Sequence, residues 1–99
     1  AYAVTRGHSL GIPHRDIRDY FDLHQSERNA IDALLKMRKE TLTEIDAEIT
    51  GFNVGINVGK TAGQSILHVH VHLIPRRVGD VEDPFGGVRG IIPDMQGYG

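Results

Sequence analysis

The sequence predicts an α+β fold in which an antiparallel β-sheet carries one long α-helix packed on one face. Two observations lead to this class. Apolar residues recur at a helical period over 26–49, and two later segments, 52–58 and 66–75, alternate in the manner of half-buried strands. A chain of 99 residues has room for one domain, so we expect 1–99 to form a single domain.

The first predicted element is a short strand at 8–12 that a following proline ends. Strict alternation along this strand places His8 on the same side as Leu10 and Ile12, which we expect to face the core. The polar stretch 14–24 is then expected to form a loop before the helix.

The long helix is predicted at 26–49, with His24 or Ser26 able to cap its start. Gly51 follows its predicted end, where helices often finish in a left-handed residue. One apolar stripe runs along the segment at a period near 3.6 residues. The stripe consists of Ile31, Leu34, Leu35, Leu42, Ile45 and Ile49.

Two strands complete the predicted sheet, at 52–58 and 66–75, with a loop at 59–65 between them. Alternation predicts that the aliphatic residues of the first strand face the helix and that its small polar residues face an open side. The open side would carry Asn53, Gly55 and Asn57. From about Arg76 the chain is rich in glycine and proline, so an irregular tail is expected.

Composition excludes several functional classes. The net charge of −2 gives no general basic field for nucleic acid, and no apolar run is long enough to span a membrane. Cysteine is absent, which excludes disulfides and thiolate sites and suits a cytoplasmic location. A chain this short buries a limited share of its surface, so a homodimer is possible.

The segment His68-Val69-His70-Val71-His72-Leu73 places three of the six histidines at every second position. On a strand all three imidazoles would share one face, which makes ordinary exposed histidines an improbable interpretation. A zinc site is an alternative, although three ligands in line on one strand converge poorly on a tetrahedral ion. A third interpretation is nucleophilic attack on phosphorus by a neutral imidazole, with the neighbouring rings orienting it and donating to phosphate oxygens.

The loop before this strand adds an anion-binding feature. Its glycines allow backbone N–H groups to approach a phosphate, and Gln64 and Ser65 offer neutral hydrogen-bond donors. An ordinary connection between two strands is an equally good interpretation of the loop by itself.

The block Gly63-Gln64-Ser65-Ile66-Leu67-His68-Val69-His70-Val71-His72-Leu73-Ile74-Pro75-Arg76 resembles the signature of the histidine triad (HIT) superfamily of nucleotide hydrolases and transferases. Gly7-His8-Ser9-Leu10-Gly11-Ile12-Pro13 and Asn53-Val54-Gly55-Ile56-Asn57 resemble its upstream strands. The likeness covers nearly the whole chain, although members usually carry an additional N-terminal segment that helps to form the nucleoside pocket.

The resemblance implies a role for each matching residue. His70 matches the nucleophile that becomes nucleotidylated, His72 the histidine that contacts the phosphate, and His68 the supporting first member of the triad. His8 matches a distant histidine of the same network. Gln64 and Asn57 match polar positions near the phosphates, to which we add Ser65 as a further substrate contact.

The ending Pro75-Arg76 and the tail resemble the Fhit-like branch, which includes bacterial dinucleoside polyphosphate hydrolases. The expected function is therefore hydrolysis at the α-phosphate with release of a nucleoside monophosphate, with Arg76 as a phosphate contact. A Hint-like nucleoside phosphoramidase and a catalytically weak nucleotide-binding domain of a larger protein are the alternatives. We expect no metal site and no permanent cofactor in the protein, and any Mg²⁺ would arrive with the substrate.

Overall fold

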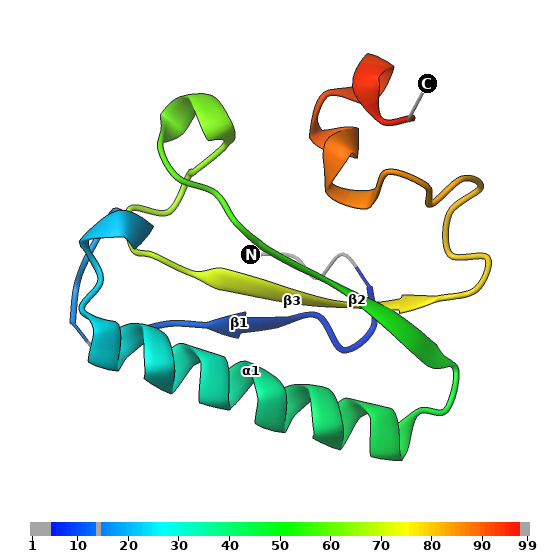
Figure 1. The fold of residues 1–99 in the computed structure, drawn as a ribbon, viewed down its shortest axis with the longest axis horizontal. Coiled ribbons are helices and arrows are strands. Elements are labelled where there is room, and N and C mark those ends of the chain that lie inside the picture. Colours follow the sequence, from blue (N-terminus) through cyan, green and yellow to red (C-terminus); the bar gives the residue numbers. More distant parts are fainter. Residues whose placement is uncertain (1–4, 14, 98–99) are drawn as a thin grey trace.

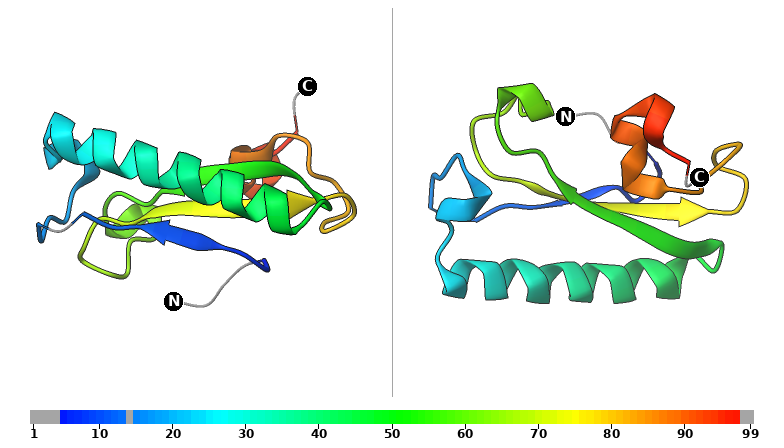
Figure 2. Two further views of the ribbon diagram at one scale, coloured as in Figure 1. Left: turned by 90° about the horizontal axis from the view of Figure 1, so that it is seen from below. Right: turned by 45° about the horizontal axis from the view of Figure 1, so that its top comes forward.

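The computed structural model describes residues 5–13 and 15–97, and it shows the expected α+β layers. Three antiparallel strands form the sheet in the order β1-β3-β2, with β1 at Ser9–Gly11, β2 at Ile49–Ile56 and β3 at Val71–Arg77. The helix α1, Gln25–Ile45, covers one face, as Figures 1 and 2 show. The loop after β2 and the C-terminal segment lie on the opposite side of the sheet, which we call the open face (Figure 1).

The core lies between α1 and the sheet in two adjoining clusters. One consists of Leu23, Ile31, Val69 and Val71, and the other of Leu42, Ile49 and Leu73. Phe52 and Ile56 of β2 pack against these clusters, as their alternation predicted. Val54 shares that face but is half exposed, because β2 is an edge strand.

The helix begins after one of the two predicted caps but ends earlier than predicted. His24 occupies the N-cap position, and the Glu27 carboxylate accepts a hydrogen bond from the His24 backbone N–H at 2.7 Å. The helix ends at Ile45 because Asp46 is extended and its side chain accepts from the Glu48 backbone N–H, which closes a tight turn.

The prediction that Ile49 continues the helical stripe is wrong. Ile49 starts β2 and is buried beside Leu42 and Leu73. Its apolar side chain fits the helical period in the sequence, but it packs into the core from the sheet and not from the helix. Gly51 is not a helix terminator either. It lies in β2 opposite Arg76, next to an irregularity in the strand register.

The histidine strand is shorter than predicted, since β3 begins at Val71 instead of residue 66. Both neighbouring strands end at this level, because Gly11 of β1 and Ile56 of β2 are the partners of Val71. Residues before Val71 therefore have no strand to pair with. The Val69 N–H instead donates to the Ile17 carbonyl at 2.7 Å.

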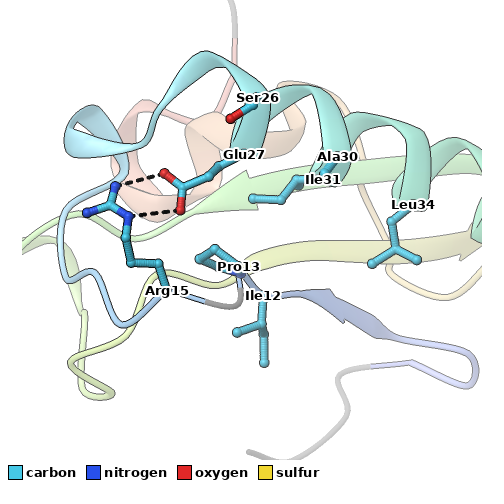
Figure 3. Close-up of a pocket in the computed structure, with 8 residues that line it drawn as sticks. All are labelled: Ile12, Pro13, Arg15, Ser26, Glu27, Ala30, Ile31 and Leu34. Atoms are coloured by element: carbon cyan, nitrogen blue, oxygen red, sulfur yellow. Dashed lines mark hydrogen bonds and ion pairs between the residues drawn. The ribbon is translucent and has the colours of Figure 1, made fainter.

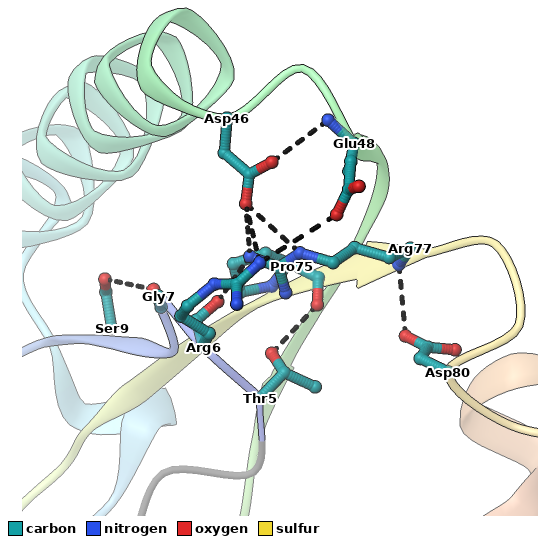
Figure 4. Close-up of polar contacts among 9 residues, drawn as sticks. All are labelled: Thr5, Arg6, Gly7, Ser9, Asp46, Glu48, Pro75, Arg77 and Asp80. Carbon is teal, nitrogen blue, oxygen red and sulfur yellow. Dashed lines mark hydrogen bonds and ion pairs between the residues drawn. The ribbon is translucent and has the colours of Figure 1, made fainter.

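Polar contacts join the ends of α1, β3 and the N-terminal part of the described chain (Figure 4). The Arg77 guanidinium contacts Asp46 at 2.9 Å and donates to the Arg6 carbonyl, while the Thr5 hydroxyl donates to the Pro75 carbonyl. Hydrogen bonding to Arg77 holds the pKa of Asp46 below its usual value. These contacts fix the end of the sheet that lies away from the histidines.

Two short 3-10 helices, Gly87–Ile91 and Pro93–Met95, give the C-terminal segment more structure than the predicted irregular tail. Gly86 has a φ of +89°, and a Cβ there would overlap the Gln96 carbonyl, so glycine is required at that position. The Gln96 amide donates to the carbonyls of Asp83 and Phe85 and closes the segment on itself.

Candidate active site

Strand register brings His8 and His72 together on the open face. Leu10 of β1 lies opposite His72 of β3, so the side of β1 that carries Leu10 belongs to the open face. His8 lies on that side, and its Nε2 is 2.8 Å from Nδ1 of His72. The two rings stack, with centroids 5.0 Å apart.

The expectation that His8 faces the core is therefore wrong. It assumed that Leu10 and Ile12 point inward, but both are substantially exposed. Gly11 faces the helix instead, and a Cβ at Gly11 would lie 3.3 Å from Ile31 Cγ2. Because α1 lies close to β1 at this point, a glycine faces the helix, and the larger Leu10 and Ile12 remain exposed.

His70 lies just before β3, and its Nδ1 is 2.9 Å from the carbonyl oxygen of His68. A carbonyl only accepts hydrogen bonds, so Nδ1 carries the proton and Nε2 carries the lone pair. The ring of His70 meets that of His72 edge to face, with centroids 5.0 Å apart. His70 is only 9% exposed, so neighbouring atoms cover most of this residue.

His68 has a different position from the other histidines. Its Nε2 is 3.2 Å from the Pro13 carbonyl, an acceptor that requires the proton on Nε2. Among residues 5–13 and 15–97, the close contacts between histidine rings join His8 with His72 and His72 with His70, and they do not include His68. Its backbone carbonyl, rather than its ring, makes the direct contact with His70.

The environment of His72 favours its neutral form. Partial burial lowers its pKa, and positive charge on His70 or His8 would lower it further. The His72 ring contacts both neighbours, so it lies where a positive charge is least favourable. His72 is therefore suited to act as a neutral hydrogen-bond donor.

Gln64 is nearly buried and all its amide groups are used. Its Oε1 accepts from the Gly59 N–H at 2.9 Å, and its Nε2 donates to the carbonyls of Arg18 at 2.8 Å and Ile66 at 3.2 Å. The side chain thus fixes the loop 59–65 and joins it to residue 18. In this arrangement it shapes the loop, and its direct contact with substrate stays a prediction.

Arg76 is also engaged. Its guanidinium makes two 2.8 Å hydrogen bonds to the Asp80 carboxylate and a 2.6 Å hydrogen bond to Asn53 Oδ1. Hydrogen bonding to Arg76 holds the pKa of Asp80 far below its usual value. A phosphate would have to compete with Asp80 for Arg76, so its role as a phosphate contact also stays a prediction.

Asn57 and Ser65 are exposed, one just after β2 and the other just after Gln64. Their predicted substrate contacts stay predictions. Sequence reasoning missed three other groups that fix the site: the backbone carbonyls of Pro13, Ile17 and Arg18. No sequence signal could identify them, because every residue carries a carbonyl.

In the described part of the chain, no group of three or more His, Asp or Glu side chains is placed to hold a metal ion. None of the helices described combines the length and apolar character needed to cross a membrane. A hollow of about 420 Å³ lies between α1 and the end of β1, on the helix side of the sheet (Figure 3). Arg15 pairs with Glu27 at its edge, and none of the histidines that the structure describes lines it, so this hollow is separate from the histidine cluster (Figure 3).

The comparisons with known proteins agree with this geometry. The family model described as the HIT domain matches residues 1–79. The nitrilase and fragile histidine triad fusion protein NitFhit of Caenorhabditis elegans is 35% identical over 80 residues, which are 81% of this chain and 18% of that protein. Its crystal structure superposes with a TM-score of 0.75 and 29% identity, covering 95% of this chain and 22% of that chain.

Two further relatives carry names that refer to dinucleoside polyphosphates. The AP-4-A phosphorylase of Mycobacterium tuberculosis is 34% identical over 97 residues, covering 95% of this chain and 49% of that protein. The asymmetrical bis(5'-nucleosyl)-tetraphosphatase of Schizosaccharomyces pombe is 34% identical over 80 residues, covering 81% and 43%. The chain thus spans about half or less of the length of these relatives.

Proposed function

The chain belongs to the HIT family, and on that basis we propose that it cleaves dinucleoside polyphosphates at the α-phosphate through a covalent nucleotidyl-His70 intermediate. The observation that carries the proposal is the hydrogen bond from His70 Nδ1 to the His68 carbonyl. It leaves the Nε2 lone pair available for attack on phosphorus. The names of two relatives supply the substrate class.

In the first step His70 Nε2 forms a bond to the α-phosphorus, and the bond from phosphorus to the leaving phosphate oxygen breaks. The imidazole ring becomes positively charged as the N–P bond forms. The His68 carbonyl then accepts from a cationic N–H, a hydrogen bond stronger than the one in the resting state. This contact therefore stabilises the transition state more than the ground state.

The pair of His72 and His8 is suited to the phosphate oxygens. If His8 Nε2–H donates to His72 Nδ1, the His72 proton lies on Nε2 and is free to donate to a phosphate oxygen. Because burial disfavours a charged His72, this donor stays neutral at neutral pH.

In the second step a water oxygen attacks the phosphorus of nucleotidyl-His70. The N–P bond breaks, His70 leaves as a neutral imidazole with its lone pair restored on Nε2, and the water proton passes to the medium. The products are a nucleoside monophosphate and the nucleotide released in the first step.

The direct test is replacement of His70. His70→Ala should abolish turnover of diadenosine tetraphosphate, and mass spectrometry of the wild-type chain quenched during turnover should find the adenylyl group on His70. A matched control is His24→Asn, which changes a histidine remote from the cluster and leaves a good helix N-cap. Wild-type turnover by the His70→Ala chain, or an adduct on another residue, would exclude the mechanism.

Phosphorolysis is a second candidate because the M. tuberculosis relative is named a phosphorylase. Inorganic phosphate would then replace water in the second step and give a nucleoside diphosphate in place of the monophosphate. Product analysis with and without phosphate separates the two acceptors. A nucleoside phosphoramidate assayed beside them tests the phosphoramidase alternative, and binding of AMP without any turnover would favour a binding domain.

A further inference from the structure

Lys60 lies in the loop between β2 and β3, at the start of the 3-10 helix Lys60–Ala62. We propose that Lys60 is a specificity-determining residue that binds the phosphates of the leaving group and favours longer polyphosphate chains. This inference rests on the proposed function, because it concerns the part of the substrate beyond the α-phosphate at His70. The loop that carries Lys60 rises on the open face of the sheet, opposite α1, as two views show (Figures 1 and 2).

The loop holds Lys60 in a defined position. Gly59 and Gly63, on either side of the 3-10 helix, have φ values of +87° and +94°, which glycine adopts without strain. The Gly63 N–H donates to the Lys60 carbonyl, and the Gln64 amide accepts from Gly59. The backbone on both sides of Lys60 is therefore fixed.

The Gln64 side chain also connects the loop to the segment that leads to His70, the proposed nucleophile. Gln64 Nε2 donates to the Ile66 carbonyl, two residues before His68, whose own carbonyl holds His70. The loop of Lys60 and the ring of His70 thus belong to one stretch of chain, residues 59–70, with a hydrogen bond near each end. Lys60 lies near the start of this stretch, and the ring that we propose as the nucleophile lies at its end.

The charge of Lys60 is not balanced in the way that the charges of the two β3 arginines are. Arg76 is paired with Asp80, and Arg77 with Asp46. Lys60 is exposed, and within residues 5–13 and 15–97 no carboxylate forms an ion pair with it.

A polyphosphate chain gains negative charge with each added phosphate, whereas the neutral imidazoles of the cluster offer it little compensation. A lysine ammonium is a mobile point charge on a flexible stem. It can follow phosphates whose position changes with chain length, and it needs no fixed geometry. Lys60 is therefore suited to the distal phosphates rather than to the reacting one.

The test compares Lys60→Gln with Lys60→Arg and with Lys39→Gln, a matched control on the exposed surface of α1. The kcat/KM is measured for diadenosine tri-, tetra- and pentaphosphate and for adenosine phosphoramidate, whose leaving amine carries no phosphate. Lys60→Gln should lower kcat/KM by about fivefold for the tetraphosphate at low salt, as expected for one solvent-exposed charge contact. The loss should grow with chain length, vanish for the phosphoramidate and shrink in high salt, while Lys60→Arg retains activity.

A binding measurement separates this inference from the proposed function. Calorimetry on His70→Asn, with and without Lys60→Gln, compares adenosine tetraphosphate with AMP and needs no turnover. Weaker binding of the tetraphosphate alone supports the assignment of Lys60 even if the wild-type chain hydrolyses nothing. Equal losses for both nucleotides, an effect no larger than that of Lys39→Gln, or equal kcat/KM losses for all substrates would overturn it.

Discussion

His8 and His72 share a hydrogen bond across neighbouring strands, with Nε2 and Nδ1 2.8 Å apart. One ring nitrogen donates and the other accepts, so protonation of both rings would break the contact. This pair connects a residue near the start of the chain with the histidine segment. Because His8 contributes to the lowered pKa of His72, substitution of His8 alone should change the titration of His72.

We expect His72 to titrate below the ordinary histidine pKa of about 6.5, because partial burial and its histidine neighbours disfavour the charged ring. An unfolded chain then binds more protons than the folded one between the folded pKa and about 6.5. The free energy of unfolding should therefore rise with pH through that window and level off above it. An NMR titration of the His72 ring protons measures the pKa, and urea denaturation at several pH values measures the free energy of unfolding.

His8→Leu should raise the pKa of His72 towards its ordinary value, since it removes one of the groups that lower it. It should also reduce turnover about fivefold, the equivalent of one neutral hydrogen bond of about 1 kcal/mol. His8→Gln, which keeps a donor at this position, should lose less. The His72 titration and kcat are measured on both variants, and equal behaviour of Leu and Gln would contradict the role of the hydrogen bond.

Gln64→Ala should lower the free energy of unfolding by about 1–3 kcal/mol, because the Gly59 N–H and the Arg18 carbonyl lose their partner in a nearly buried place. Gln64→Glu should cost at least as much, since a carboxylate cannot donate to the carbonyls of Arg18 and Ile66. Urea denaturation measures both. Gln25→Ala, which removes an exposed contact to Asn29 on α1, should cost far less.

Gly11→Ala tests the contact between α1 and β1. The added Cβ would lie 3.3 Å from Ile31 Cγ2, so the Ile31 side chain must move by a few tenths of an ångström, at an expected cost of about 1–3 kcal/mol. Gly55→Ala is the matched control in β2, where a Cβ meets no atom within 4 Å. Equal thermal denaturation midpoints for the two variants would show that the helix adapts freely.

Acid should weaken the start of α1. Hydrogen bonds from the Arg15 side chain and the His24 backbone N–H lower the pKa of Glu27 to about 2. An unfolded glutamate has a pKa of about 4.3, so this contribution to stability is complete above that pH and is lost as pH falls towards 2. Glu27→Gln should show a smaller loss of stability between pH 4.3 and 2 than the wild-type chain, as followed by circular dichroism during urea denaturation.

The sequence predicted the antiparallel sheet and the helix that covers one face of it, because alternation and helical period report which side of each element is buried. Alternation did not predict the histidine cluster correctly: it placed His8 toward the core and grouped His68 with His70 and His72, and only the family resemblance connected His8 with the other histidines. The prediction also failed at Ile49 and at residues 66–70, where an apolar or alternating pattern continued past the end of the element. The extent of β3 depends on where β1 and β2 stop, and a pattern within one segment contains no information about its neighbours.

The face of β1 was predicted incorrectly for a related reason. Alternation fixes which residues share a side but not which side is covered, and the larger residues suggested an inward direction. Gly11 faces the helix, where a Cβ would make a tight contact of 3.3 Å with Ile31 Cγ2. The hydrogen bonds of Gln64 and Arg76 could not be predicted from the sequence either. Gln64 donates to the backbone carbonyl of Arg18 in a distant loop, and Arg76 donates to the carboxylate of Asp80 in the tail.

The contact that orients the His70 ring spans only two residues of the same chain, from Nδ1 to the carbonyl of His68. The protonation pattern of the proposed nucleophile is therefore encoded locally, and it does not depend on a side chain brought from another part of the fold. Under the proposed mechanism, substitutions in the loop of Lys60 or in the C-terminal segment would alter which molecules reach the site while Nε2 of His70 keeps its lone pair. Such a separation allows substrate preference to diverge among descendants of one ancestral sequence without loss of the underlying chemistry.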